Sequence, residues 1–126
     1  MVNQDISRMV VYKGSCHCKK IVFEFNTKNI FDDIYTCNCS LCLKKSIFMK
    51  ADDKKNFKIL SGNSYISCYK WNKRIAEHYF CKHCGVYTHH KRRREPNQIS
   101  VNLRCVDGIL IPSELVINEV DGASHS

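Results

Sequence analysis

The chain has 126 residues, of which 44% are hydrophobic and 25% charged, as is typical of a globular protein. This length fits one domain with a modest core, so we expect residues 1–126 to form a single domain. No apolar run approaches the ~20 residues that cross a bilayer, and the first nine residues lack an apolar signal region. We therefore expect a cytoplasmic protein with no membrane partner.

The formal net charge is +8, from 20 Lys and Arg against 12 Asp and Glu. Such an excess fits anionic partners, including nucleic acid. The basic residues are densest at Lys91–Arg94, which we interpret as a solvated loop in preference to a phosphate-binding patch. No basic strand interleaved with aromatic residues resembles an RNA-binding signature. Nucleic acid is therefore an open but disfavoured partner.

In chain order, short apolar or alternating stretches predict strands at Met9–Lys13, Ile21–Phe25, Ile47–Lys50, Tyr65–Tyr69, Arg74–Phe80, Ile99–Leu103 and Leu115–Val120. Turn-forming residues separate them at Gly14, Asn26–Asn29, Gly62-Asn63, Pro96-Asn97 and Asp107-Gly108. One short helical turn is expected after Ser40, since serine is a good N-cap. The pattern predicts a mainly β fold of several small sheets, with a frayed tail from Asp121 to Ser126.

The chain has nine cysteines, and in a reducing compartment clustered thiols indicate metal ligands or catalysts. Seven of them form three clusters, Cys16-x-Cys18, Cys37-x-Cys39-x-x-Cys42 and Cys81-x-x-Cys84. A structural zinc ion takes four ligands in a tetrahedron. Joining the two pairs closes one site with four thiolates and leaves the triplet with three. The count therefore predicts two zinc ions, one in a closed site and one in an open site.

The local spacing supports the closed site. In an extended segment the side chains of Cys16 and Cys18 lie on the same face. Cys81-x-x-Cys84-Gly85 is typical of a zinc-binding turn, and Gly85 suits the positive φ that such a turn needs. A closed site would tie together two distant parts of the chain, so that metal binding stabilises the fold.

The triplet is the candidate functional centre. Cys42 is expected on the first turn of the short helix, where the backbone amides favour a thiolate. Three protein ligands with one free position are typical of catalytic zinc. Two alternatives remain open. The triplet could be a group of redox thiols without metal, or a histidine could close the site as a fourth ligand.

The remaining cysteines and histidines have individually weaker signals. Cys68, on a predicted strand, and Cys105 are expected to be small buried side chains. His17 and His83 lie between proposed ligands and are expected to point outward. The candidate acid–base groups are His78, His89 and His90.

The motifs occur in the order Gly14–Cys18, Ile21–Phe25, Cys37–Cys42, Phe57–Gly62, Phe80–Val86 and Arg104–Gly108. In this order they resemble the glutathione-dependent formaldehyde-activating family, which also contains centromere protein V, over about residues 12–122. The resemblance implies an Mss4-like fold of several small antiparallel sheets around the zinc sites. It implies structural zinc on Cys16, Cys18, Cys81 and Cys84, and catalytic zinc on Cys37, Cys39 and Cys42.

The resemblance also implies an activity, a carbon–sulfur lyase that acts on a thiol adduct such as S-hydroxymethylglutathione, with glutathione as co-substrate. The candidate cations for an anionic substrate are Lys44, Lys45, Lys73, Arg74 and Arg104. Two other functions stay open: a zinc-stabilised module that binds nucleic acid or protein, and a GTPase-binding chaperone. The chaperone is suggested by shared fold alone, which does not carry function.

Overall fold

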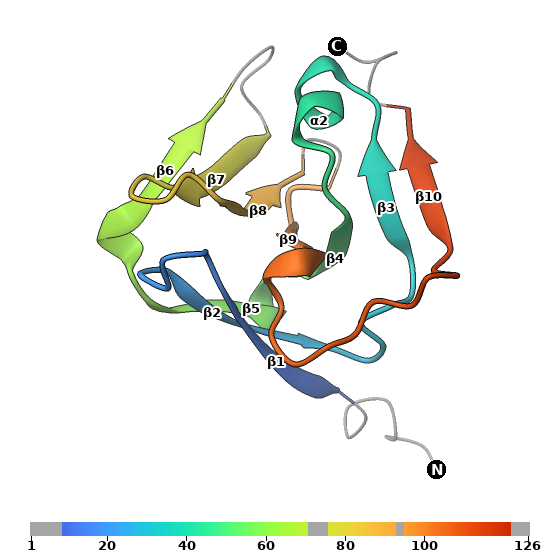
Figure 1. Ribbon diagram of the computed structural model, residues 1–126, viewed down its shortest axis with the longest axis horizontal. Coiled ribbons are helices and arrows are strands. Elements are labelled where there is room, and N and C mark those ends of the chain that lie inside the picture. The colour runs from blue at the N-terminus through green and yellow to red at the C-terminus, as the bar shows by residue number, and fades with distance from the viewer. Residues whose placement is uncertain (1–8, 71–75, 93–94, 122–126) are drawn as a thin grey trace.

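The structure is a computed structural model that describes residues 9–70, 76–92 and 95–121. It is mainly β, as expected. One sheet has three strands in the order β1-β2-β5, which are β1 (Val10–Ser15), β2 (Val22–Thr27) and β5 (Phe57–Ser61). The other has seven strands in the order β10 (Ile117–Val120), β3 (Ile34–Cys37), β4 (Met49–Asp53), β9 (Gln98–Asn102), β8 (Tyr87–Lys91), β7 (Glu77–Cys81) and β6 (Ile66–Tyr69). In Figure 1 the small sheet lies along the bottom of the molecule.

The helices are short. Within the described ranges they are α2 (Ser40–Lys45) and three 3₁₀ turns, η1 (Lys54–Asn56), η2 (Asn63–Tyr65) and η3 (Leu103–Cys105). None of these has the length and apolar character that crossing a membrane requires. The predicted turn after Ser40 is present as α2, but the capping prediction was wrong. Cys39 is the N-cap, and its sulfur accepts a hydrogen bond from the Cys42 amide, which makes Ser40 the first helical residue.

The hydrophobic core lies between the two sheets. Strand β2 alternates along its length, with Phe23, Phe25 and Thr27 buried and Val22, Glu24 and Asn26 half-buried. From the larger sheet and η3, Ile34, Val101 and Leu103 pack into the same cluster and are fully buried too. Burial of each such side chain contributes about 1.5–3 kcal/mol. This packing holds Ile34 at the start of β3 and Val101 in β9. It therefore positions β3 and the helix α2 that follows it, which lies at the top of Figure 1.

Gly14 lies within β1, opposite Phe23, and does not form the predicted break before the next strand. A Cβ atom at this position would collide with the ring of Phe23 and with the backbone carbonyl of Cys105. The glycine therefore permits a close approach between β1 and the η3 region, where Gly14 also forms an isolated bridge with Val106.

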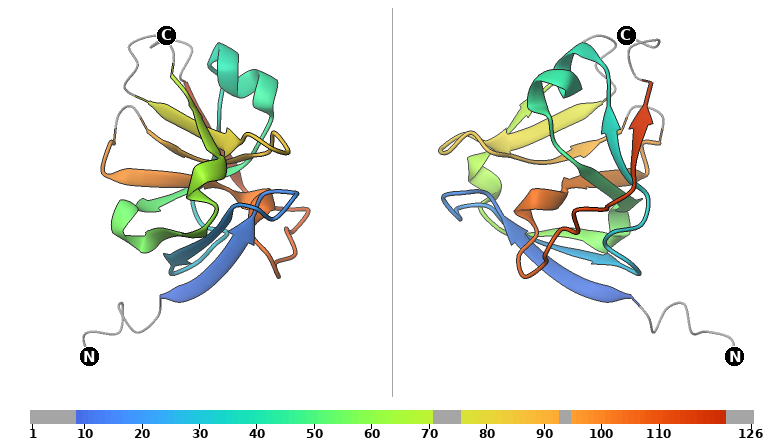
Figure 2. Two further views of the ribbon diagram at one scale, coloured as in Figure 1. Left: turned by 90° about the vertical axis from the view of Figure 1, so that its left-hand side faces the viewer. Right: turned by 45° about the vertical axis from the view of Figure 1, so that its right-hand side comes forward.

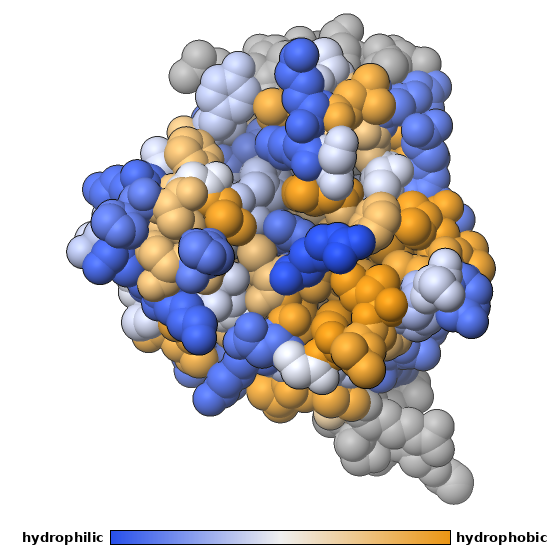
Figure 3. All heavy atoms as spheres, in the orientation of Figure 1, coloured by the Kyte–Doolittle hydropathy of each residue, from blue (hydrophilic) through white to orange (hydrophobic). Residues whose placement is uncertain are grey.

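All strand pairs of the described chain are antiparallel except one. Strand β10 runs parallel to β3, with Ile117 opposite Ile34 and Val120 opposite Cys37. The segment between η3 and β10 makes this direction possible, because it crosses the molecule before β10 begins (Figures 1 and 2). Along it, Ile109, Ile111 and Leu115 pack on the core, while Leu110 and Val116 are exposed. Figure 3 shows the resulting hydrophobic surface on the right-hand side.

The sequence pattern identified most strands but not all of them. Six predicted strands coincide, within a few residues, with β1, β2, β4, β6, β9 and β10, and β7 begins at Glu77 within the predicted Arg74–Phe80. Strands β3, β5 and β8 were not predicted. Strand β8 has the sequence Tyr-Thr-His-His-Lys, which lacks an apolar alternation because it buries polar side chains. The tail beyond Asp121 lies outside the described residues.

The two isolated cysteines have different environments. Cys105 is buried, as predicted, but it lies on η3. Cys68 is exposed, so its predicted burial was wrong. It lies on β6, an edge strand of the seven-stranded sheet. Among the residues that the structure describes, neither cysteine belongs to a group that could hold a metal ion.

Candidate metal centres

Four cysteine sulfurs from two hairpin turns lie together. Cys16 and Cys18 lie in the turn after β1, and Cys81 and Cys84 lie at the turn between β7 and β8. The Sγ–Sγ distance is 3.6 Å between Cys16 and Cys18 and 3.7 Å between Cys18 and Cys81. Zinc–sulfur bonds of about 2.3 Å in a tetrahedron would place the sulfurs about 3.8 Å apart. The arrangement therefore matches the donor set of a four-thiolate metal site.

Backbone amides surround these sulfurs. The Ile21 amide points at the sulfur of Cys16 at 3.4 Å, and the His83 and Cys84 amides point at the sulfur of Cys81 at 3.3 and 3.4 Å. Such donors stabilise thiolates. Burial raises the pKa of Cys84, but hydrogen bonds with backbone groups outweigh it and lower this pKa to about 6. Burial and hydrogen bonds with the other three thiols instead raise the pKa of Cys18 to about 11, so a cation is needed for all four sulfurs to be thiolates.

The turns have the backbone that this geometry requires. Gly85 has a φ of +81°, as expected from the sequence, and Lys19 holds a φ of 65° in the first turn. His17 and His83 are exposed between the cysteines, also as expected. The turns therefore direct their sulfurs inward and their basic side chains to solvent.

The second group contains Cys37, Cys39 and Cys42, whose sulfurs all lie within 4.8 Å of one another. Cys37 ends β3, Cys39 caps α2, and Cys42 lies on its first turn. Across the described ranges, no histidine, carboxylate or further cysteine joins this group. The alternative of a histidine as fourth ligand finds no support among these residues.

Three cysteines this close do not readily ionise together. The pKa of Cys42 is raised, first by its hydrogen bond with Cys37, then by burial and by the charge of Cys37. A divalent cation among the sulfurs would remove this penalty, and soft sulfur ligands favour zinc over harder metals. Both cysteine groups therefore fit zinc by donor type and number.

A cluster of basic and aromatic side chains faces the triplet. Lys45, at the end of α2, places its Nζ 3.0 Å from His78 Nδ1 and 3.7 Å from the centre of the Tyr87 ring. The Tyr87 hydroxyl lies 3.1 Å from the same His78 nitrogen. Burial raises the pKa of Tyr87 well above its usual value, and charges at Cys42, Cys39 and Cys37 raise it further. Tyr87 is therefore a protonated phenol beside the sulfurs.

A β-bulge brings Tyr87 and His90 to the same face of β8. Tyr79 lies opposite His89 and Phe80 opposite Tyr87, so Thr88 is an extra residue in the ladder. As a result the rings of Tyr87 and His90 lie 6.0 Å apart, and His90 stacks on His78 at 5.3 Å. His89 lies elsewhere, stacked on Tyr79 at 4.6 Å. Of the three candidate acid–base histidines, two therefore adjoin Tyr87, on whose pKa the charges of the triplet act.

These histidines are neutral at physiological pH. Burial lowers the pKa of His78 to about 4 and that of His89 to about 3. Burial also lowers the pKa of His90, and the charges of His78 and Lys45 add to this effect. The Nδ1 atom of His90 is buried without a hydrogen-bond partner among the described residues.

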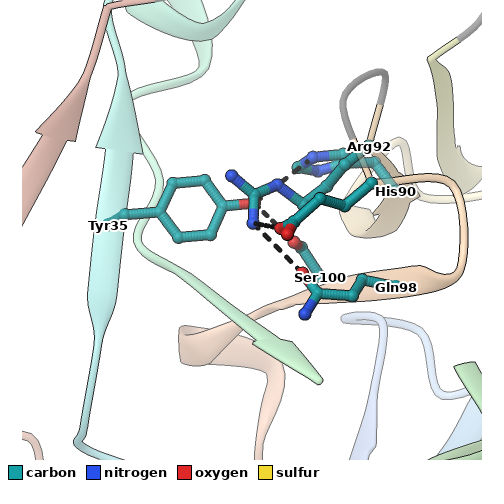
Figure 4. A network of polar contacts seen from close by, with 6 residues as sticks. Tyr35, His90, Arg92, Gln98 and Ser100 are labelled. Carbon is teal, nitrogen blue, oxygen red and sulfur yellow. Dashed lines mark hydrogen bonds and ion pairs between the residues drawn. The ribbon is translucent and has the colours of Figure 1, made fainter. Parts of the chain in front are cut away.

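Tyr35 links the triplet strand to the rest of the large sheet (Figure 4). Its hydroxyl shares a short hydrogen bond with Ser100 Oγ and lies 3.4 Å from His90 Nε2. The Arg92 guanidinium covers its ring at 4.7 Å and is held in turn by Glu95 at 3.0 Å. Burial raises the pKa of Tyr35 to about 12, although Arg92 opposes this shift. The network fixes Tyr35, and with it Cys37 two residues along β3.

The predicted substrate cations are dispersed. Lys45 is close enough to the triplet for charges on its three cysteines to act on the amine, whereas Lys44 is exposed on α2. Arg104 is exposed on η3, with its guanidinium 5.3 Å from the Phe48 ring. Lys73 and Arg74 lie outside the described residues.

The predicted Lys91–Arg94 loop was only partly correct. Lys91 ends β8, and Arg92 is half-buried in the Tyr35 network instead of being solvated. Residues 93–94 lie outside the described part of the chain. No sequence motif pointed to Tyr35 or Tyr87, although Tyr35 precedes Cys37 by two residues and so shares its strand face.

Comparison with known proteins identifies the family. A crystal structure of a Rhodobacter sphaeroides protein shares 30% sequence identity with this chain and superposes with a TM-score of 0.80. The match covers 86% of this chain and 99% of the other. The sequence profile of the family described as glutathione-dependent formaldehyde-activating enzyme matches residues 11–117. This match spans both cysteine groups and most of the fold. The chain therefore belongs to the glutathione-dependent formaldehyde-activating enzyme family.

Proposed function

We propose that this protein is a zinc-dependent enzyme of the carbon–sulfur lyase type that acts on a small thiol and its hydroxymethyl adduct. The observation that carries the proposal is the triplet of Cys37, Cys39 and Cys42, which no fourth ligand completes among the described residues. Family membership adds glutathione as the expected thiol and formaldehyde as the expected carbonyl. Cys16, Cys18, Cys81 and Cys84 would hold a second zinc ion with a structural role.

The proposed reaction joins a thiol to formaldehyde. The thiol loses its S–H proton, its sulfur attacks the carbonyl carbon, and a carbon–sulfur bond forms as the carbon–oxygen π bond breaks. The oxygen then takes up a proton to give the S-hydroxymethyl product. In the reverse direction the same bond breaks and the oxygen loses its proton. When bound at the triplet, zinc would stabilise the sulfur as a thiolate at neutral pH.

The chain supplies the remaining requirements. Tyr87 is a protonated phenol, and Lys45 is an amine within hydrogen-bond distance of His78, so both are donors for the carbonyl oxygen. His78 and His90 are neutral at physiological pH because burial lowers their pKa, so they serve as hydrogen-bonding groups and not as proton acceptors. The Tyr35 network holds the β3 strand in place, which keeps Cys37 oriented toward α2.

Recognition of glutathione would require cations near the site. Lys45 has the position for this, and Lys44 and Arg104 are exposed and able to contact parts of a substrate outside the triplet. We keep Arg74 as a fourth candidate from the sequence.

The direct test is the rate of exchange between free formaldehyde and S-hydroxymethylglutathione, measured by NMR with and without the protein. We expect the wild-type protein to accelerate the exchange above its spontaneous rate and Cys39→Ala to lose this acceleration. Cys68→Ala is the matched control, because it removes an exposed cysteine outside both groups. A wild-type rate equal to the spontaneous rate, in protein that carries two zinc ions, would refute the proposed activity.

A non-catalytic binding module is the second candidate. The observation that favours it is the cluster of exposed Lys19, Lys20 and Lys82 on the two turns around the four-cysteine group. Phosphate contacts made by such lysines would give binding that weakens steeply with salt. A generic oligonucleotide that fails to bind at low salt would remove this candidate.

A further inference from the structure

Lys45 is a half-buried cation without a carboxylate partner in the described chain. The ion pairs found there join Lys70 to Glu77 and Arg92 to Glu95. The Nζ atom of Lys45 instead contacts His78 Nδ1 and the face of the Tyr87 ring, both of which are neutral. Burial lowers the pKa of Lys45 to about 8, so the amine is still mostly protonated at neutral pH, and a nearby negative group would stabilise this half-buried charge.

The helix geometry identifies this negative group. Cys42 and Lys45 are three residues apart on α2, so they share one face of the helix. Both are half-buried, whereas Leu43 and Lys44 between them are exposed on the opposite face. The charges of Cys42, Cys39 and Cys37 also act on Lys45, where they oppose the effect of burial on its pKa. When its cysteines are thiolates, the triplet is therefore an anionic partner for Lys45.

His78 and Tyr87 hold the amine in this position. The single lone pair on His78 Nδ1 is approached by Lys45 Nζ at 3.0 Å and by the Tyr87 hydroxyl at 3.1 Å. A cationic Lys45 can donate one N–H to this nitrogen and retain two for the triplet side. The ring of Tyr87 attracts the ammonium group by a cation–π contact. These contacts hold the side chain of Lys45, which extends from the end of α2, against the β7–β8 hairpin.

We propose that Lys45 is a positioning residue that makes the triplet site take its fourth group as an anionic thiolate in preference to a neutral donor. This inference rests on the open metal site of the proposed function. Three thiolates around a divalent ion carry one net negative charge, which would repel an incoming anion. The charge of Lys45 cancels it. When a thiol binds, its S–H bond breaks, the electron pair stays on sulfur, and the proton leaves to solvent.

The test compares an anionic and a neutral ligand at the same site. We would load the full chain with cobalt(II), which accepts the same donors as zinc and has visible absorption bands, and titrate it with 2-mercaptoethanol or imidazole. The thiol has no charge besides the one that it acquires at sulfur, so recognition of carboxylates does not contribute. The variants are Lys45→Met, Lys45→Arg and Lys58→Met. Lys58 is exposed on β5 in the other sheet, and its replacement removes the same formal charge.

We expect Lys45→Met to weaken 2-mercaptoethanol binding about tenfold or more and imidazole binding much less, because only the thiolate brings a charge. Lys45→Arg should restore thiol binding, and Lys58→Met should bind both ligands as the wild type does. Equal weakening of both ligands, or no weakening of the thiol, would overturn the inference. If wild-type protein bound neither ligand, the open site itself would be refuted. Discrimination between the ligands without formaldehyde exchange would refute only the proposed lyase activity.

Discussion

Loss of a cysteine should have very different effects in the two groups. Cys84→Ala removes a ligand from the group that joins residues 63 positions apart, as between Cys18 and Cys81. Treated as a cross-link, a loop of this length lowers the entropy of the unfolded chain by an amount worth about 4 kcal/mol. The triplet spans only five positions, from Cys37 to Cys42, and the same relation gives about 2 kcal/mol.

Domains of this size have a free energy of unfolding of about 5–15 kcal/mol, so the larger loss approaches the whole stability. We expect Cys84→Ala to be unfolded or nearly so at 37 °C, and Cys39→Ala to remain folded with a lower midpoint. Circular dichroism and urea unfolding would measure both, with Cys68→Ala as the control. Equal destabilisation by Cys84→Ala and Cys39→Ala would refute the division into a structural and an open site.

Three further variants test particular contacts. Gly14→Ala should lower the free energy of unfolding by about 1–3 kcal/mol in urea, since its Cβ meets the Phe23 ring and a backbone carbonyl; unchanged stability would mean that β1 moves freely. Tyr35→Phe leaves Ser100 Oγ without its partner and should cost about 1–3 kcal/mol, whereas a neutral effect would remove the network's role in holding β3. His89 stays neutral to about pH 3, while an unfolded chain protonates it below about pH 6.5. Stability should therefore fall as the pH drops through this window, and His89→Phe should lessen the fall between pH 7 and pH 5 by about 2 kcal/mol in urea titrations; a fall equal to that of the wild type would contradict this.

The two cysteine groups could be predicted from the sequence, because the prediction needs only the spacing and the number of the cysteines. Spacing alone places Cys16 beside Cys18 and Cys81 beside Cys84, and the requirement for four ligands suggests joining the pairs. The structure brings the same four sulfurs together and leaves the triplet apart. The mainly β class was likewise predictable from short alternating stretches.

The side chains around the triplet could not be predicted in this way. An alternating pattern places Tyr87 and His90 on opposite faces of β8, and only the bulge at Thr88 brings them together. The contact between Lys45 and His78 joins residues 33 positions apart, which no spacing rule relates. The predicted burial of Cys68 was wrong for a similar reason. A sequence pattern that predicts a strand does not say whether that strand lies at the edge of a sheet.

The β7–β8 hairpin connects the two cysteine groups physically. Its turn carries Cys81 and Cys84, while its strands carry His78 and Tyr87, which face the triplet and hold Lys45. A hairpin whose turn is not fixed cannot keep the bulge in register, so the lining of the triplet depends on the four-cysteine group. The reverse dependence is weak, because the triplet lies within a short local segment.

Metal should therefore load in a fixed order. When metal-free protein is titrated with zinc, we expect the β-sheet signal in circular dichroism to be complete at about one equivalent, with a second equivalent bound afterwards and no further gain of structure. Cys84→Ser should weaken metal binding at the triplet, whereas Cys39→Ser should leave the first equivalent unaffected. Structure that grows evenly over both equivalents would mean that the triplet also organises the fold, and the two groups would then have to be regarded as one cooperative unit.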